Sequence, residues 1–342
     1  MSTVTAEKPL VAISIGDFNG VGPEVILKTF SDARILKLCT PVIYANFKIF
    51  ARYKKLLTHE EVSFHSIKSI EEVSHRKVNI KVCWENDYEI NPGTPTAESG
   101  KCAFISLEEA TKDALKGKVQ LLVTAPLDKK NIQNDNFNFP GHTEYLAAQF
   151  SNTEPLMLMT GESMRICMVT AHVPLKDVSA MITPELLNKK INILHQSLKK
   201  DFGIKKPKIA VLGLNPHAGE KGLLGGEEQT IIAPLIKEWK EKGHLLEGPF
   251  SADGFFAAGT YRHFDGVVAM YHDQGLIGFK TIDFQSGVNF TAGLPIVRTS
   301  PDHGTAYDLA GKNLADESSF RQAVYTGLEI LKSRTENLTQ KA

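Results

Sequence analysis

Short apolar runs alternate with segments of helical composition along the first third of the chain. The runs are rich in β-branched residues and predict buried strands at residues 10–15, 42–44, 62–66, 78–83 and 121–123. The segments between them predict helices at residues 23–30, 46–57 and 99–115. Strands that alternate with helices in this way are typical of a parallel, doubly wound α/β sheet.

The α/β pattern continues to the end of the chain. Residues 156–159 and 165–169 predict a paired hairpin with Gly161 and Glu162 in its turn. Further strands are predicted at residues 208–214, 267–270, 287–291 and 295–298. Helices are predicted at 143–150, 184–200, before residue 242, after Ser251, at 305–310 and at 318–332. A chain of 342 residues accommodates two domains more naturally than one.

Three histidines directly follow apolar strands. His172 comes after residues 165–169, His217 after 208–214, and His272 after 267–270. Ligands of open α/β sheets bind just beyond the carboxyl ends of the strands. Three neutral imidazoles with one open position suit a divalent ion such as zinc or cobalt acting as a Lewis acid. The residues alone leave a second reading equally open, in which these are ordinary surface or core histidines.

Two loops invite comparison with anion-binding turns. His142 and Thr143 open a predicted helix, where side chains and free backbone N–H groups can bind an anion; a capping box without a ligand explains the pattern equally well. Residues 16–24 form a glycine-rich turn after the first strand, but their spacing is not G-x-G-x-x-G. For that turn we favour a structural role over a phosphate cradle.

Composition narrows the function classes. The formal net charge is zero and there are no basic runs, so we expect neither nucleic acid nor a membrane surface as a partner. The sequence has no signal-peptide pattern at its N-terminus and no apolar run long enough to span a bilayer. The four cysteines lack paired spacing, which favours reduced thiols and a cytoplasmic location over two disulfides.

Seven motifs, taken together, resemble the 4-hydroxythreonine-4-phosphate dehydrogenase family. They occur in the family's order and spacing between residues 11 and about 312, at 16–24, 141–144, 171–175, 215–220, 271–275, 287–289 and 298–306. The resemblance implies an isocitrate/isopropylmalate dehydrogenase-like fold of two doubly wound α/β domains with a cleft between them. We place the first domain at 1–130 with 310–342, and the second, which carries most of the site, at 131–309.

The resemblance also implies a reaction and its cofactors. It is the NAD-dependent oxidation of 4-(phosphooxy)-L-threonine to 2-amino-3-oxo-4-(phosphooxy)butanoate, which decarboxylates to 3-amino-2-oxopropyl phosphate, in pyridoxal phosphate biosynthesis. One divalent metal ion (zinc, magnesium or cobalt) per active site assists the oxidation. The implied assembly is a homodimer with shared active sites, to which both subunits contribute metal ligands.

Individual roles follow from the family's motifs, matched residue by residue. The implied metal ligands are His172, His217 and His272. The implied substrate-binding residues are His142, Thr143, Lys280, Asn289 and Arg298. The candidate catalytic residues are Lys280, a proton relay or an anion partner, and Asp253. The implied cofactor-binding residues are His303, Gly304, Thr305 and Asp308.

Alternatives and departures accompany this resemblance. Related dehydrogenases of 4-phosphoerythronate or phosphothreonate retain the same scaffold, and a non-catalytic ligand-binding protein is the alternative from another class.

Asp308 is expected to accept hydrogen bonds from ribose hydroxyls and to repel a 2′-phosphate, which favours NAD over NADP. Two positions depart from the family pattern: Phe18-Asn19 replaces Pro-Ala, and Asp316 stands where Asn is frequent.

Overall fold

The chain divides into two compact units. The computed structural model describes residues 8–59, 62–134, 137–150 and 154–339. The first unit comprises Met1–Thr153 with Leu294–Leu328, and the second comprises Glu154–Gly293 with Glu329–Ala342. This division differs from the boundaries that we expected, because it assigns residues 131–153 and 294–309 to the first unit and residues 329–342 to the second. The reason is packing: Phe137 and Tyr145 contact Phe104 of the first unit, and Val297 pairs with Leu121.

The first unit contains a wholly parallel sheet. Its strand order is β3-β4-β2-β1-β5-β12. The strands are β1 (Leu10–Ser14), β2 (Thr40–Ala45), β3 (Phe64–Ile67), β4 (Val78–Val82), β5 (Leu121–Thr124) and β12 (Val297–Pro301). The doubly wound α/β pattern expected for this part is therefore confirmed, and the carboxyl ends of β1, β5 and β12 share one edge of the sheet.

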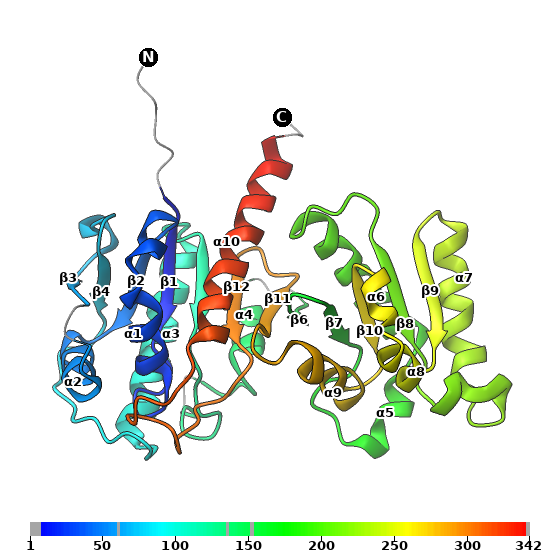
Figure 1. Ribbon diagram of the computed structural model, residues 1–342, viewed down its shortest axis with the longest axis horizontal. Helices are drawn as coiled ribbons and strands as arrows, with labels where there is room; N and C mark the ends of the chain where they lie inside the picture. The colour runs from blue at the N-terminus through cyan, green and yellow to red at the C-terminus, as the bar shows by residue number, and fades with distance from the viewer. Residues whose placement is uncertain (1–7, 60–61, 135–136, 151–153, 340–342) are drawn as a thin grey trace. The chain divides into compact units, whose positions relative to one another are not determined.

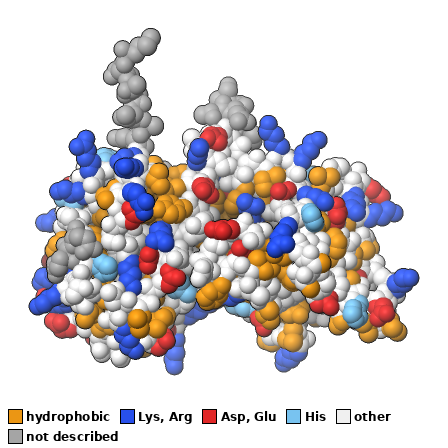
Figure 2. All heavy atoms as spheres, in the orientation of Figure 1, with side chains coloured by type: hydrophobic (Ala, Val, Ile, Leu, Met, Phe, Trp, Pro, Cys, Tyr) orange, Lys and Arg blue, Asp and Glu red, His pale blue; other side chains and the backbone are white. Residues whose placement is uncertain are grey.

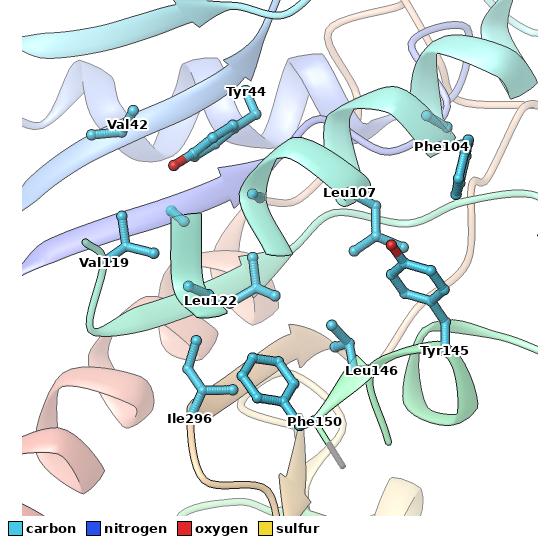
Figure 3. Packing of buried hydrophobic residues seen from close by; sticks show 14 of the residues in the cluster. Val42, Tyr44, Phe104, Leu107, Val119, Leu122, Tyr145, Leu146, Phe150 and Ile296 are labelled. Carbon is cyan, nitrogen blue, oxygen red and sulfur yellow. The ribbon is translucent and has the colours of Figure 1, made fainter. Parts of the chain in front are cut away.

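Helices and short helical turns join these strands. They are α1 (Gly22–Ser31), η1 (Ala33–Lys37), α2 (Phe47–Leu57), η2 (Ile70–Glu72), α3 (Ala97–Leu115) and α4 (His142–Gln149). One buried cluster joins the sheet to α3 and α4; Figure 3 shows Leu107 of α3, Leu146 of α4 and Leu122 of β5 within it. Thr96 begins α3 with a capping box, because its hydroxyl accepts from the Ser99 N–H and Ser99 Oγ accepts from the Thr96 N–H.

The second unit contains a mixed sheet with the order β11-β6-β7-β10-β8-β9. The strands are β6 (Leu156–Thr160), β7 (Arg165–Met168), β8 (Lys208–Leu212), β9 (Leu245–Phe250), β10 (Gly266–Ala269) and β11 (Val288–Ala292). Strands β7, β10, β8 and β9 are parallel, whereas β6 runs antiparallel to both β7 and β11. The predicted hairpin of β6 and β7 is thus confirmed. Figure 1 shows β10 and β8 next to each other in this unit.

The helical elements of the second unit connect these strands. They are α5 (Leu175–Met181), α6 (Pro184–Lys200), η3 (Pro216–Gly222), the π-helical turn η4 (Glu228–Ile232), α7 (Ala233–Glu241), α8 (Ala252–Ala257), η5 (Thr260–His263) and α9 (His272–Asp283). Helix α10 (Ser318–Thr339) begins in the first unit and ends in the second. A buried cluster that includes Ala210, Val267 and Phe279 forms the core.

Several local predictions were wrong or incomplete. Residues 305–310, which we expected to be helical, are not: residues 307–310 form a turn, and Ala306 before it has a positive φ of 39°. Strand β9 and helices α5 and α9 were not predicted. Of the helices in the described residues, none is long and apolar enough to cross a membrane. The face in Figure 2 carries interspersed Lys, Arg, Asp and Glu side chains, in agreement with the even charge balance.

Candidate active site

The three strand-end histidines lie in the second unit, after three adjacent parallel strands. His172 follows β7, His217 follows β8, and His272 is the first residue of α9, directly after β10. Because β10 pairs in parallel with both β7 and β8, these carboxyl ends share one edge of the sheet. The prediction that each histidine occupies a strand end is confirmed.

Two of the histidines are neighbours. The ring centroids of His172 and His272 are 6.0 Å apart. His272 Nδ1 lies 2.6 Å from Asp273 Oδ1, so the carboxylate fixes the ring and leaves Nε2 available on its other side. Bonds of about 2.1 Å from a metal to two imidazole nitrogens are compatible with such a ring separation. Among the residues that the structure describes, however, no group of three His, Cys, Asp or Glu side chains is arranged to hold a metal ion.

His217 lies in a turn of unusual conformation. Five consecutive residues, 217–221, have positive φ angles between 42° and 76°, and only Gly219 among them is a glycine. Hydrogen bonds from the Ser251 hydroxyl and the Gly254 N–H lower the pKa of Asp253, and a weaker electrostatic interaction with His217 acts in the same direction. Asp253 is exposed at the start of α8 and is a carboxylate at neutral pH.

Lys280 and Asn289, the two other candidates in the second unit, have different surroundings. Lys280 is half-buried in the last turn of α9. Asn289 is on β11, opposite Met159 of β6, and its buried Oδ1 atom has no hydrogen-bond partner among the residues that the structure describes. A buried amide oxygen of this kind is suited to accept a hydrogen bond from a ligand.

The first unit contains a buried arginine, Arg298, among the candidate substrate residues. Arg298 on β12 is 2 % exposed, and its Nη2 donates to Thr124 Oγ1 of β5 over 2.6 Å. Burial lowers its pKa to about 10, and the Glu144 carboxylate opposes that shift. Burial also lowers the pKa of His142 well below its ordinary value, with further contributions from Arg298 and Lys129. A guanidinium kept charged beside a neutral imidazole favours a bound anion.

His142 and its neighbour Thr143 occupy the first turn of α4, with Gly141 before them. The residue at the cap position is a glycine, which has no side chain of its own to cap the helix start. The backbone N–H groups of a first helical turn lack partners within the helix and can bind an anion, and Arg298 lies close enough to His142 to lower its pKa. The predicted substrate residues of this unit form one anion-attracting group, whereas Lys280 and Asn289 belong to the other unit.

The predicted cofactor loop follows β12 and is anchored by a buried carboxylate that sequence reasoning missed. Asp17 is 1 % exposed, and its Oδ2 accepts from Tyr307 Oη, Ser99 Oγ and Asn131 Nδ2, each over 2.9 Å. Burial, and then the Asp17 charge, raise the pKa of Tyr307. The Val21 N–H also donates to Thr305 O over 2.9 Å. These bonds fix the loop at the shared edge of β1, β5 and β12.

A second buried carboxylate holds the far end of this loop. Glu24 is fully buried on α1 and accepts from the N–H groups of Gly311 and Ala315, and from Lys28 Nζ. Within the loop, the buried Nε2 of His303 has no hydrogen-bond partner in the described part of the chain, whereas Gly304 and Asp308 are exposed. An unsatisfied buried nitrogen and an exposed carboxylate fit the polar edge of a nucleotide. The only sequence signal for Asp17 and Glu24 was their position in the glycine-rich turn after β1.

Comparison with known proteins agrees with this geometry. The family model for "Pyridoxal phosphate biosynthetic protein PdxA" matches residues 37–327. A 4-hydroxythreonine-4-phosphate dehydrogenase of Bacteroides thetaiotaomicron is 48% identical over 325 residues, which cover 95% of this chain and 89% of that protein. A relative from Oceanobacillus iheyensis, provisionally named D-threonate 4-phosphate dehydrogenase, is 40% identical over 95% of this chain and 98% of its own.

The fold also has a close counterpart among solved structures. The crystal structure of 4-hydroxythreonine-4-phosphate dehydrogenase from Klebsiella pneumoniae matches with a TM-score of 0.83 and 32% identity. The match covers 96% of this chain and 99% of that one. The mixed α/β architecture predicted from the sequence is therefore confirmed at the level of the whole chain.

Proposed function

This chain belongs to the pyridoxal phosphate biosynthetic protein PdxA family, and we propose that it oxidises 4-(phosphooxy)-L-threonine with NAD and one divalent metal ion. Family membership makes it an oxidoreductase that acts as a 4-hydroxythreonine-4-phosphate dehydrogenase. The observation that carries the metal-assisted reaction is the presence of His172, His217 and His272 after three adjacent parallel strands.

The residues of the second unit would hold the metal and handle the proton. His172, His217 and His272 would ligate a zinc, magnesium or cobalt ion, which supplies a Lewis acid that favours ionisation of the substrate hydroxyl. Imidazole ligands suit zinc or cobalt better than magnesium. Lys280 would move the hydroxyl proton, and Asp253, already ionised, would accept a hydrogen bond from the substrate. Asn289 Oδ1 would accept another.

Arg298, His142 and Thr143 would bind an anionic group of the substrate. Arg298 is buried, so its charge is poorly solvated and strongly favours a phosphate or carboxylate. A neutral His142 can donate one hydrogen bond without adding a competing charge. Oxidation at the hydroxyl carbon gives a carbonyl β to the carboxylate, and the product then loses carbon dioxide to give 3-amino-2-oxopropyl phosphate.

NAD would bind along the loop of His303, Gly304, Thr305 and Asp308. The dehydrogenase family implies a nicotinamide dinucleotide as the cofactor. The preference for NAD is supported by the exposed Asp308 carboxylate, which would accept from ribose hydroxyls, and by the lack of arginine between His303 and Phe320. We further propose that the enzyme is a cytoplasmic homodimer whose subunits share metal ligands.

D-threonate 4-phosphate is a second candidate substrate, because a relative at 40% identity bears that activity in its name. Steady-state turnover should be measured on both phosphorylated substrates and on 4-phosphoerythronate, each with NAD and with NADP, after loading with zinc or cobalt. We expect the highest kcat/KM for 4-(phosphooxy)-L-threonine with NAD. A higher kcat/KM for a phosphorylated acid without the amino group would reassign the substrate, and equal efficiency with NADP would remove the role given to Asp308. No turnover on any of them would favour a ligand-binding protein.

A further inference from the structure

His217 is presented by a backbone conformation that the local sequence does not favour. Positive φ angles are adopted readily by glycine, yet four of the five residues in 217–221 have a Cβ atom. A run of left-handed residues persists only when surrounding contacts determine it. The contacts that hold this turn therefore decide where the imidazole of His217 lies.

One buried carboxylate holds the chain just ahead of this turn. Glu228 is 3 % exposed, and its Oε1 accepts from the N–H groups of Leu214 and Asn215, both over 2.7 Å. Its Oε2 accepts from Asn215 Nδ2 over 3.0 Å. These bonds clamp Leu214 and Asn215, which only Pro216 separates from the left-handed turn. Glu228 thus fixes the point at which the chain leaves β8.

Two glycines, one before the turn and one within it, lie close to the same carboxylate. A Cβ atom at Gly219 would lie 2.5 Å from Glu228 Oε2, and one at Gly213 would lie 3.1 Å from Oε1 and 2.9 Å from Ala218 Cα. The chain is therefore wrapped closely around the Glu228 side chain. Glu228 is also the first residue of the π-helical turn η4, a rare conformation that occurs frequently at functional sites.

From these contacts we infer that Glu228 is a positioning residue that sets His217 for metal binding, an assignment that rests on the proposed metal site. It acts through Leu214 and Asn215 and touches neither metal nor substrate. Residues that orient a metal ligand typically change metal affinity by about 10- to 100-fold when they are replaced. The charge matters, because an anion accepts from three donors at once more strongly than a neutral amide does.

Glu228→Gln is the decisive substitution, and Glu227→Gln is its matched control. Glutamine keeps the shape, but its NH2 group would face a donor, since the Glu228 carboxylate accepts from three N–H groups. The neighbouring Glu227 accepts from Asn215 Nδ2 over 2.8 Å and from Ser179, whereas the backbone N–H groups of Leu214 and Asn215 donate to Glu228. The control therefore removes one carboxylate charge beside the turn without releasing the clamp.

Two measurements on the full chain distinguish an effect of Glu228 on the position of His217 from a general loss of structure. Hydrogen exchange of the metal-free protein should be at least about tenfold faster at the Leu214 and Asn215 amides in Glu228→Gln, and unchanged in Glu227→Gln. Titration with Co²⁺, followed by its visible absorption, should give a Kd weakened about 10- to 100-fold in Glu228→Gln and unchanged in the control. His217→Ala defines the loss expected when a ligand is removed.

The outcomes separate this inference from the proposed function. Equal Co²⁺ binding by wild type and His217→Ala would reject the metal site, and with it the role of Glu228 toward the metal. Lost binding in His217→Ala with wild-type binding in Glu228→Gln would reject the inference alone. If Glu228→Gln does not fold, Gly219→Ala displaces the same carboxylate with a methyl group. Wild-type Co²⁺ affinity in folded Gly219→Ala would likewise overturn the inference.

Discussion

Replacing Asp17 by Asn should weaken the first unit and its cofactor loop together. The Asp17 carboxylate accepts four hydrogen bonds, three at Oδ2 and one at Oδ1 from the Asn19 N–H. An amide in one orientation presents NH2 to the three donors at Oδ2, and in the other orientation it presents NH2 to the Asn19 N–H. Either way, at least one buried donor loses its acceptor, and the remaining bonds are no longer charge-assisted.

The magnitude follows from these contacts. A buried donor without a partner costs about 1–3 kcal/mol, and each bond to a charged group contributes about 1 kcal/mol more than a neutral one. Asparagine carries no charge, so the variant no longer incurs the desolvation cost of a buried carboxylate, which offsets part of this loss. We expect the free energy of unfolding of the first unit to fall by about 2–4 kcal/mol. Tyr307→Phe, which removes one of the four bonds, should cost about 1 kcal/mol.

The assay uses the placement of the two tryptophans. Trp84 is buried in the first unit and Trp239 in the second, so in a Trp239→Phe background the fluorescence of Trp84 reports unfolding of the first unit by urea. The KM for NAD should rise in Asp17→Asn because Tyr307 anchors the cofactor loop. A loss below about 1 kcal/mol would refute the hydrogen-bond reasoning. An unchanged KM in a destabilised protein would refute the link to the loop.

Three further predictions concern single side chains. Burial, and then the electrostatic interaction with His244, lower the pKa of His195 to about 4. As pH drops from 6.5 toward 4, the unfolded chain binds the proton first, so the free energy of unfolding should fall by up to about 3 kcal/mol. Urea unfolding of His195→Leu at the same pH values should lack this pH-dependent loss. Arg298→Lys loses the planar fork and should raise the KM for the phosphorylated substrate by roughly 10- to 100-fold in steady-state assays, and an unchanged KM would contradict an anion at that site. His172 and His272 are neighbours within one chain, so a partner subunit could supply only His217. If it does, an equilibrated mixture of inactive His217→Ala and His272→Ala should regain about a quarter of wild-type activity. A mixture of His172→Ala and His272→Ala should regain none.

Much of the architecture could be predicted because it is encoded locally. Apolar runs such as 10–15 and 208–214 give strands regardless of their neighbours, and parallel strands place the residues that follow them at one edge. For this reason His172, His217 and His272 could be placed at strand ends from the amino-acid sequence alone. Their matched settings, rather than the presence of histidine itself, carried the signal.

The parts that could not be predicted depend on tertiary contacts. Helix α9 contains Gly275 and Gly278, which weaken a helical pattern; in the fold, a Cβ at Gly275 would lie 3.1 Å from Ala269 and Met168, so glycine allows close packing on the sheet. Residues 305–310 have helical composition, but the bond from Tyr307 to Asp17 and the positive φ of Ala306 impose a turn. The partners of Asp17 are 82, 114 and 290 residues away in sequence, beyond any local pattern.

The discontinuous first unit has a consequence for synthesis. Strand β12, which pairs with β5, is translated only after residues 154–293 of the second unit. At about 5–20 residues per second, one edge of β5 has no partner strand for on the order of ten seconds on the ribosome. An open apolar edge is a template for pairing with other chains. Fragments that end before residue 294 should therefore aggregate, and a protein of this topology depends on slow, late closure of its first sheet.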